Sequence, residues 1–143
     1  METLKFAALS RALSLQGEDL LFKTKFLLNR VNNYWGKSKT LNSLITFDVA
    51  NDELEIQIPQ CKFHCFSETK ISFIGNKPIS EVCFYTKKND ENVPFVVFHI
   101  DTDNIMTIPG REEAPKIDLD YAQNVENHFM DELVEAALKA QLF

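Results

Sequence analysis

The sequence predicts one α+β domain spanning residues 1–143. In it, an antiparallel, meander-like β-sheet of about five to seven strands lies between N-terminal helices and a long C-terminal helix packed on one face. Three observations predict this. Helical periodicity is confined to residues 2–35 and 119–141, residues 44–58 alternate between apolar and polar side chains, and 143 residues is the size of one domain.

Two helices are expected before the sheet. Residues 2–15 form the first, and Gly17 is expected to end it, because glycine adopts the left-handed C-cap conformation without a steric cost. Residues 18–35 form the second, which is amphipathic and ends at Gly36. Its buried stripe recurs at three- and four-residue steps and consists of Leu20, Thr24, Leu27, Leu28, Val31 and Trp35.

The strongest local pattern is a β-hairpin formed by residues 44–49 and 54–58. A two-residue loop at Asn51-Asp52 places every apolar side chain on one face and every polar one on the other. The expected opposite pairs are Ile45 and Ile58, Phe47 and Ile56, and Val49 and Leu54. The apolar face is expected to pack against the helices.

Further strands follow, but their faces are left open by the sequence. A turn of two or three residues near Glu68 would exchange the inward and outward positions between residues 61 and 87. Residues 95–98 are apolar on both faces, which is typical of a central strand. The expected strands are 61–67, 70–74, 80–87, 95–98 and 105–108.

The last helix is predicted from about residue 119 to 141, with Asp120 as its N-cap. Its wide apolar stripe should pack on the sheet. The stripe consists of Ala122, Val125, Phe129, Leu133, Ala136, Ala137 and Ala140.

The composition limits the kinds of partner that the protein is expected to bind and the cellular compartment in which it is expected to lie. A net charge of −6 and a pI near 5.0 disfavour nucleic-acid binding, which depends on Lys and Arg neutralising phosphates. Three cysteines, the lack of a secretory-type N-terminal pattern and the absence of an apolar run long enough to span a bilayer favour a cytoplasmic protein without membrane contact.

Few residues have the type and spacing of a catalytic, cofactor-binding or metal-binding site. Gly36-Lys37-Ser38 lacks the earlier glycine and the preceding strand of a phosphate-binding loop, and no cofactor is expected. His99, Asp101 and Asp103 alternate at a strand end and are the weak candidates for a metal site, although in an extended strand they are about 6.6 Å apart. Their simpler interpretation is that they end the strand. No catalytic set is recognised, which favours a protein that is not an enzyme but leaves the question open.

The function expected from the sequence is non-catalytic binding or an accessory role, through an apolar sheet or helix surface, in a homo-oligomer or with a protein partner. One of the available registers places a set of large apolar side chains on the sheet face opposite the helices, where they would bind a partner. This set is Phe66, Ile74, Tyr85, Phe98 and Ile100. The alternative is a small apolar-ligand-binding protein or enzyme with a Phe-lined pocket between the sheet and the C-terminal helix.

Overall fold

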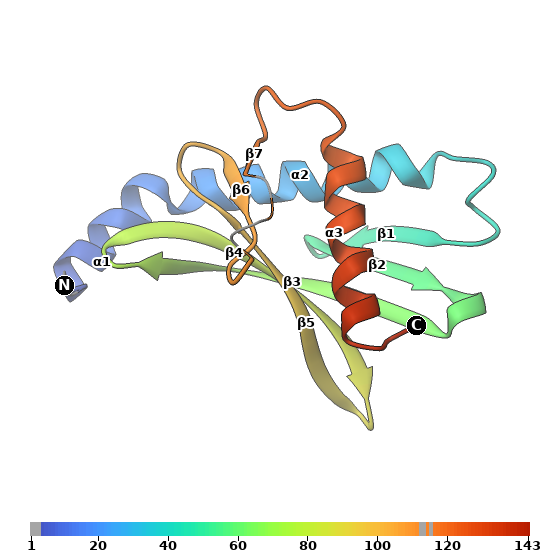
Figure 1. Cartoon of the computed structure of the whole chain (residues 1–143). Coiled ribbons are helices and arrows are strands. Elements are labelled where there is room, and N and C mark those ends of the chain that lie inside the picture. Colours follow the sequence, from blue (N-terminus) through green and yellow to red (C-terminus); the bar gives the residue numbers. More distant parts are fainter. Residues whose placement is uncertain (1–3, 112–113, 115) are drawn as a thin grey trace.

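The computed structural model describes residues 4–111, 114 and 116–143. It confirms the α+β fold with an antiparallel meander: seven strands are ordered β1-β2-β3-β4-β5-β6-β7, each paired with the next along the chain (Figure 1). The strands are β1 (Thr46–Ala50), β2 (Glu53–Ile58), β3 (Phe63–Ile74), β4 (Lys77–Lys88), β5 (Glu91–Ile100), β6 (Ile105–Thr107) and β7 (Ile117–Asp118). A short 3₁₀ helix, η2 (Pro59–Cys61), joins β2 to β3.

The N-terminal region is one continuous helix. A π-helical segment, η1 (Leu13–Gly17), connects α1 (Phe6–Ala12) to α2 (Glu18–Gly36) without a break. The expectation that Gly17 ends a helix is therefore wrong: its φ and ψ are −61° and −50°, which are helical, and the residue is buried. The π-helical turn keeps Gly17 within the helix at the point where the helix contacts strand β4.

The C-terminal helix α3 (Val125–Lys139) begins later than the sequence suggested. Its N-cap is Asn124, with φ of 59°, and not Asp120. Strand β7, the bond from the Leu119 amide to the Asn104 carbonyl, 2.9 Å, and the turn in which the Ala122 amide donates to the Asp118 carbonyl, 2.8 Å, keep the preceding segment out of the helix. The Asp120 carboxylate accepts a bond from the Asn104 side chain instead of capping the helix.

The predicted first hairpin is confirmed. Phe47 pairs with Ile56 and Val49 with Leu54. Asn51 and Asp52 both have positive φ, 54° and 62°, as the type I′ turn of a two-residue hairpin requires.

Strands β3 and β4 form a long hairpin. Its register decides which side chains between residues 61 and 87 face the helices. Glu68 lies inside β3, opposite Cys83, so the turn considered near it is absent, and the hairpin instead turns at Gly75-Asn76. Phe63, Cys65 and Ser67 consequently face the helices. Cys61 does not share their face, because it belongs to the 3₁₀ helix.

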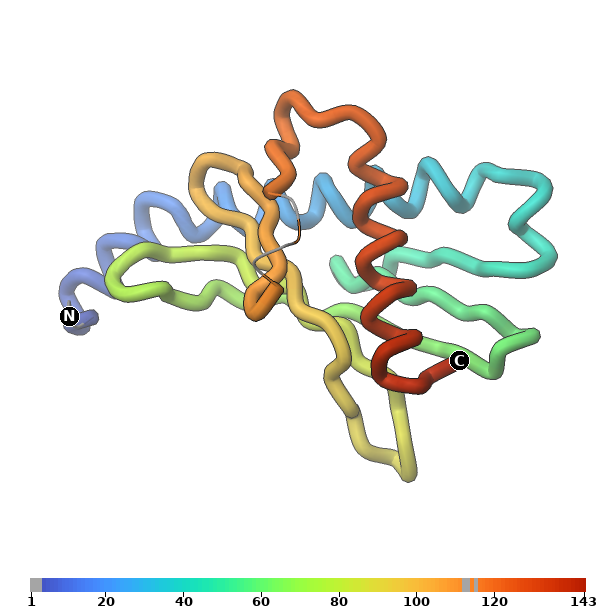
Figure 2. Tube along the Cα trace, viewed as in Figure 1, coloured from blue at the N-terminus to red at the C-terminus, as the bar shows by residue number. Residues whose placement is uncertain are grey.

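Both long helices pack on the same face of the sheet and close one core. In Figure 1, α3 crosses in front of the strands and α2 runs along their upper side; Figure 2 shows the β3–β4 hairpin extending beside the N-terminal helix. The centre of the core is a cluster of fully buried rings from β4, β5 and α3. Phe98 stacks on Phe129 with ring centroids 4.5 Å apart, and Phe84 contacts both.

Candidate functional site

The most exposed aromatic side chains of the two long helices, α2 and α3, lie on the side of α2 that points away from the core. The core side of α2 carries Leu20, Thr24, Leu27, Leu28 and Val31, all buried. We call the opposite side the outer face of α2. It consists of Glu18, Asp19, Phe22, Lys25, Phe26, Asn29 and Asn33.

Phe22 and Phe26 form the centre of the outer face. They are one helical turn apart and are 65% and 63% exposed. Burying such a side chain is worth about 1.5–3 kcal/mol, so two neighbouring rings left in water are a marked departure from the usual distribution. Leu15 and Leu21 are exposed nearby on the same helix, at 73% and 44%. Phe22 and Phe26 together form an apolar patch of the kind that marks an interface.

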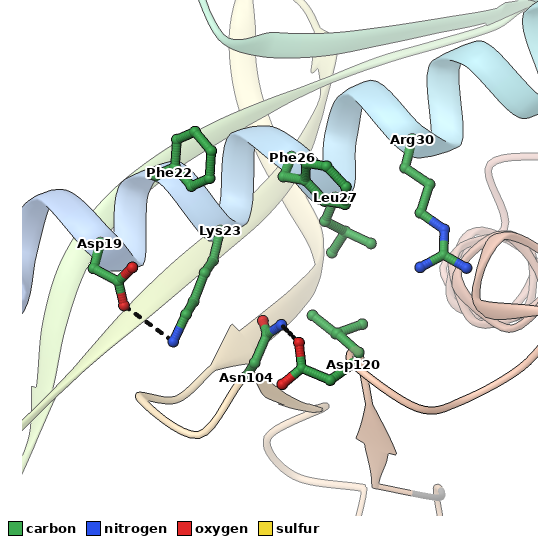
Figure 3. Close-up of a pocket in the computed structure, with 9 residues that line it drawn as sticks. Asp19, Phe22, Lys23, Phe26, Leu27, Arg30, Asn104 and Asp120 are labelled. Carbon is green, nitrogen blue, oxygen red and sulfur yellow. Dashed lines mark hydrogen bonds and ion pairs between the residues drawn. The ribbon is translucent and has the colours of Figure 1, made fainter.

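A groove of about 280 Å³ runs beside this patch, between α2 and the loops that flank β6 and β7 (Figure 3). Leu27 and Leu119, both buried, contribute apolar atoms to its lining, and Phe22 and Phe26 lie on its α2 side. The groove therefore extends the apolar surface of α2 onto the neighbouring loops.

The polar groups of the groove bind one another. Lys23 Nζ lies 3.1 Å from the Asp19 carboxylate and donates to the Thr102 carbonyl at 2.9 Å. The Asn104 amide donates to Asp120 at 2.9 Å. The groove is also slightly smaller than typical small-ligand pockets, about 300–1,000 Å³. Its chemistry thus fits the rim of a protein-docking surface better than a small-molecule site.

The structure separates the five residues that the sequence grouped into one apolar patch. Phe66 and Tyr85 face away from the helices and stack on each other, with ring centroids 5.9 Å apart, and Ile74 lies exposed further along the same face of β3. Phe98 and Ile100 are fully buried in the core. The shared face expected for all five is wrong for these two, because the register of β4 and β5 turns Phe98 and Ile100 toward the helices.

The sheet face that carries Phe66 and Tyr85 also carries charge. Glu81 lies 3.2 Å from His99 Nε2 and 3.5 Å from Lys70 Nζ. Beside them, burial raises the pKa of the Cys83 thiol, and a hydrogen bond with Cys83, followed by burial, raises the pKa of Tyr85 to about 12. This face is therefore a mixed polar surface and a weaker docking candidate than the outer face of α2.

The three weak metal candidates serve the local structure. His99 pairs with Glu81, while the Asp101 carboxylate accepts the backbone N–H groups of Asp103 and Ile105, at 2.9 and 3.0 Å. Asp101 thus closes the turn between β5 and β6. Within residues 4–111, 114 and 116–143, no group of three His, Cys, Asp or Glu side chains is arranged to hold a metal ion.

Sequence reasoning missed Phe22 and Phe26, although a signal was present. Both fall outside the apolar stripe of their helix and are four residues apart, so they share the face that should be polar. An aromatic pair at that spacing on the polar side of an amphipathic helix is visible in the sequence alone.

Comparisons of the chain with known protein families, curated protein sequences and solved structures find no match. In the described part of the chain, no helix has the length and apolar character needed to cross a bilayer.

Proposed function

We propose that this chain is a non-catalytic binding or accessory protein that acts through the outer face of α2. The observation that carries the proposal is the adjacent pair Phe22 and Phe26, each about two-thirds exposed on a rigid 19-residue helix. Rigid aromatic side chains on a helix are typical anchors of protein interfaces, since they bury a large area at little cost in conformational entropy.

The surroundings of the pair support the same function. The helix is fixed from below by buried contacts with the sheet, so its outer face is presented without reorganisation. Charged side chains, Glu18, Asp19 and Lys25, flank the rings along the helix. A central apolar area with a polar rim is the usual anatomy of a protein interface.

The alternative, a Phe-lined pocket for a small apolar ligand between the sheet and α3, has less support. The rings that would line it, Phe84, Phe98 and Phe129, are fully buried and in contact with one another. They fill the space in which a ligand would have to bind, as a packed core does.

The test is a photo-crosslinking amino acid at position 26, in the cells that make the protein, with Leu138 on α3 as the matched control position. Leu138 is 59% exposed and lies on another helix. We expect a discrete adduct at position 26 that is absent at position 138 and is lost when Phe22→Asp is added. The same weak adducts at both positions, or none at position 26, would contradict the proposal.

A further inference from the structure

We infer that residues 4–17, which comprise α1 and the π-helical segment η1, form an arm that opens and closes by local unfolding while α2 and the sheet stay folded. In the structure the arm is closed and lies beside the turn between β3 and β4 (Figure 1). The arm is separate from the docking surface proposed above, which begins at Glu18. Three observations support the inference: the burial of the arm, its contacts with the hairpin and the helical geometry where it joins α2.

The arm contributes almost nothing to the core. Every residue from Leu4 to Gln16 is exposed or half-buried, and the buried residues of the N-terminal helix begin at Gly17 and Leu20. The largest apolar side chain of the arm, Phe6, is 81% exposed. A helix of this length is marginal in water unless tertiary contacts stabilise it. Because it lacks such contacts, the arm should open at a much lower free energy than the rest of the fold.

The contact between the arm and the β3–β4 hairpin is loose. A crevice of about 380 Å³ lies between them, and three of the four α1 residues that line it are alanines, at positions 7, 8 and 12. Asn76 and Pro78 line the side of the hairpin. Within the part of the chain that the structure describes, no hydrogen bond or ion pair joins residues 4–16 to the sheet or to α3. Small apolar contacts alone therefore hold the arm closed, and its opening would uncover Pro78, which is buried.

The π-helical segment marks where the opening should stop. A π-helical turn is a rare local departure from α-helical hydrogen bonding, and the glycine at its end, Gly17, weakens a helix relative to alanine. Packing at this glycine is not tight, since a Cβ there would meet only the Leu13 side chain, at 3.8 Å. Beyond it, α2 buries Leu20, Thr24 and Leu27 in successive turns. Unfolding of the arm should therefore meet little resistance as far as Gly17 and strong resistance after it.

Hydrogen exchange of the full chain, measured by mass spectrometry, tests the arm and its boundary. We expect the amides of residues 9–16 to exchange at least about 100-fold faster than those of residues 24–31, since the second group opens only with the core. The change in protection should fall between residues 17 and 24. Equal protection of the two groups would overturn the inference.

A covalent link between the arm and the hairpin tests whether the exchange reflects opening of the arm. Ala8→Cys and Asn76→Cys, which both line the crevice, are combined with Cys61→Ser and joined by a short bismaleimide. Cys61 is replaced because it is the exposed native thiol, and the other two cysteines are buried. The matched control pairs Ala8→Cys with Lys88→Cys, at the other end of β4.

We expect the 8-to-76 link to form and the 8-to-88 link to be absent. Linking positions 8 and 76 should slow exchange in residues 9–16 by at least about tenfold, because the link restricts the open state of the arm. An equal yield of the two links, no link at position 76, or exchange that the 8-to-76 link leaves unchanged would each overturn the inference.

Discussion

The guanidinium of Arg30 on α2 donates a hydrogen bond to the carboxylate of Glu126 in the first turn of α3, and this pair joins the two helices that cover the sheet. The Trp35 ring N–H donates to the backbone carbonyl of the same glutamate at 3.2 Å. Glu126 is 8% exposed. These two bonds connect the first turn of α3 to α2.

Glu126→Gln is expected to lower the free energy of unfolding by about 1–2 kcal/mol at neutral pH, because the partly exposed Arg30 would lose its charged, buried acceptor. Burial alone would raise the pKa of Glu126, but a backbone N–H and the Arg30 guanidinium outweigh it and lower that pKa. A carboxyl with a lowered pKa stabilises the fold above its unfolded pKa, and the contribution disappears as the pH falls through the folded value. Urea unfolding of both proteins at several pH values measures it.

The difference between wild type and Glu126→Gln should therefore shrink below pH 4.5, the ordinary value for glutamate. Glu135→Gln on the same helix is the control, because the Glu135 side chain is 45% exposed and pairs at the surface. Its effect should stay within about 0.5 kcal/mol. A Glu126→Gln effect that is the same at pH 3 and pH 7 would refute the assigned role.

Thr24→Val should destabilise the protein by about 1–3 kcal/mol, because it leaves the buried Ser80 hydroxyl without its acceptor. The Thr24 hydroxyl donates to the Leu20 carbonyl at 2.9 Å, so the Ser80 hydroxyl is the donor in the 2.5 Å contact between them. Adding Ser80→Ala removes the hydroxyl that is left without an acceptor, and should recover part of the lost free energy of unfolding. Strictly additive effects of the two substitutions in denaturant unfolding would show that the hydroxyls do not act as a pair.

Gly17→Ala is expected to stabilise the protein by about 0.5–1 kcal/mol, because Gly17 has a helical backbone and the unfolded chain would lose freedom. A Cβ there would meet only Leu13 side-chain atoms, at 3.8 and 3.9 Å, which is ordinary contact. Gly75→Ala at the β3–β4 turn is the matched control. It should destabilise, since φ there is +64° although nothing lies within 4 Å. Thermal unfolding of both variants tests the sign, and a lower midpoint for Gly17→Ala would contradict the account.

The native protein should have one rapidly reacting thiol, that of Cys61, when it is titrated at pH 8 with a disulfide reagent that releases a coloured thiolate. Cys65 and Cys83 are buried; burial raises the pKa of Cys65 to about 12 and also raises the pKa of Cys83, so their thiolates are scarce. All three should react after unfolding in urea. Fast reaction of the Cys61→Ser variant in the native state would show that the β3–β4 hairpin opens more readily than its packing implies.

Much of the architecture could be predicted because local patterns agreed with the tertiary fold. Strict alternation and the Asn51-Asp52 loop fixed the first hairpin, and the buried stripe of α2 was readable from Leu20 to Val31. The start of α3 was not readable, because β7 pairing with β6 holds the residues before Asn124 out of the helix. That contact is distant in sequence and leaves no local signal.

The candidate site could be predicted only in part for a similar reason. The faces of Phe98 and Ile100 depend on the alignment of β4 with β5, which includes a register shift at Phe84/Tyr85. Phe95 is apolar as well, so composition alone does not tell the inward positions of that strand from the outward ones. The exposed pair Phe22 and Phe26 was not predicted, although both residues lie outside the buried stripe at helical spacing.

The most direct measurement of the central claim is hydroxyl-radical footprinting of Phe22 and Phe26, in dilute purified protein and in intact cells, with Leu138 as the internal reference. If the outer face of α2 is a docking surface, both rings are oxidised readily in the dilute chain and are protected in cells, while Leu138 reacts equally in both. Equal oxidation of the rings in the two settings would mean that nothing covers this helix, and the proposed function would be wrong.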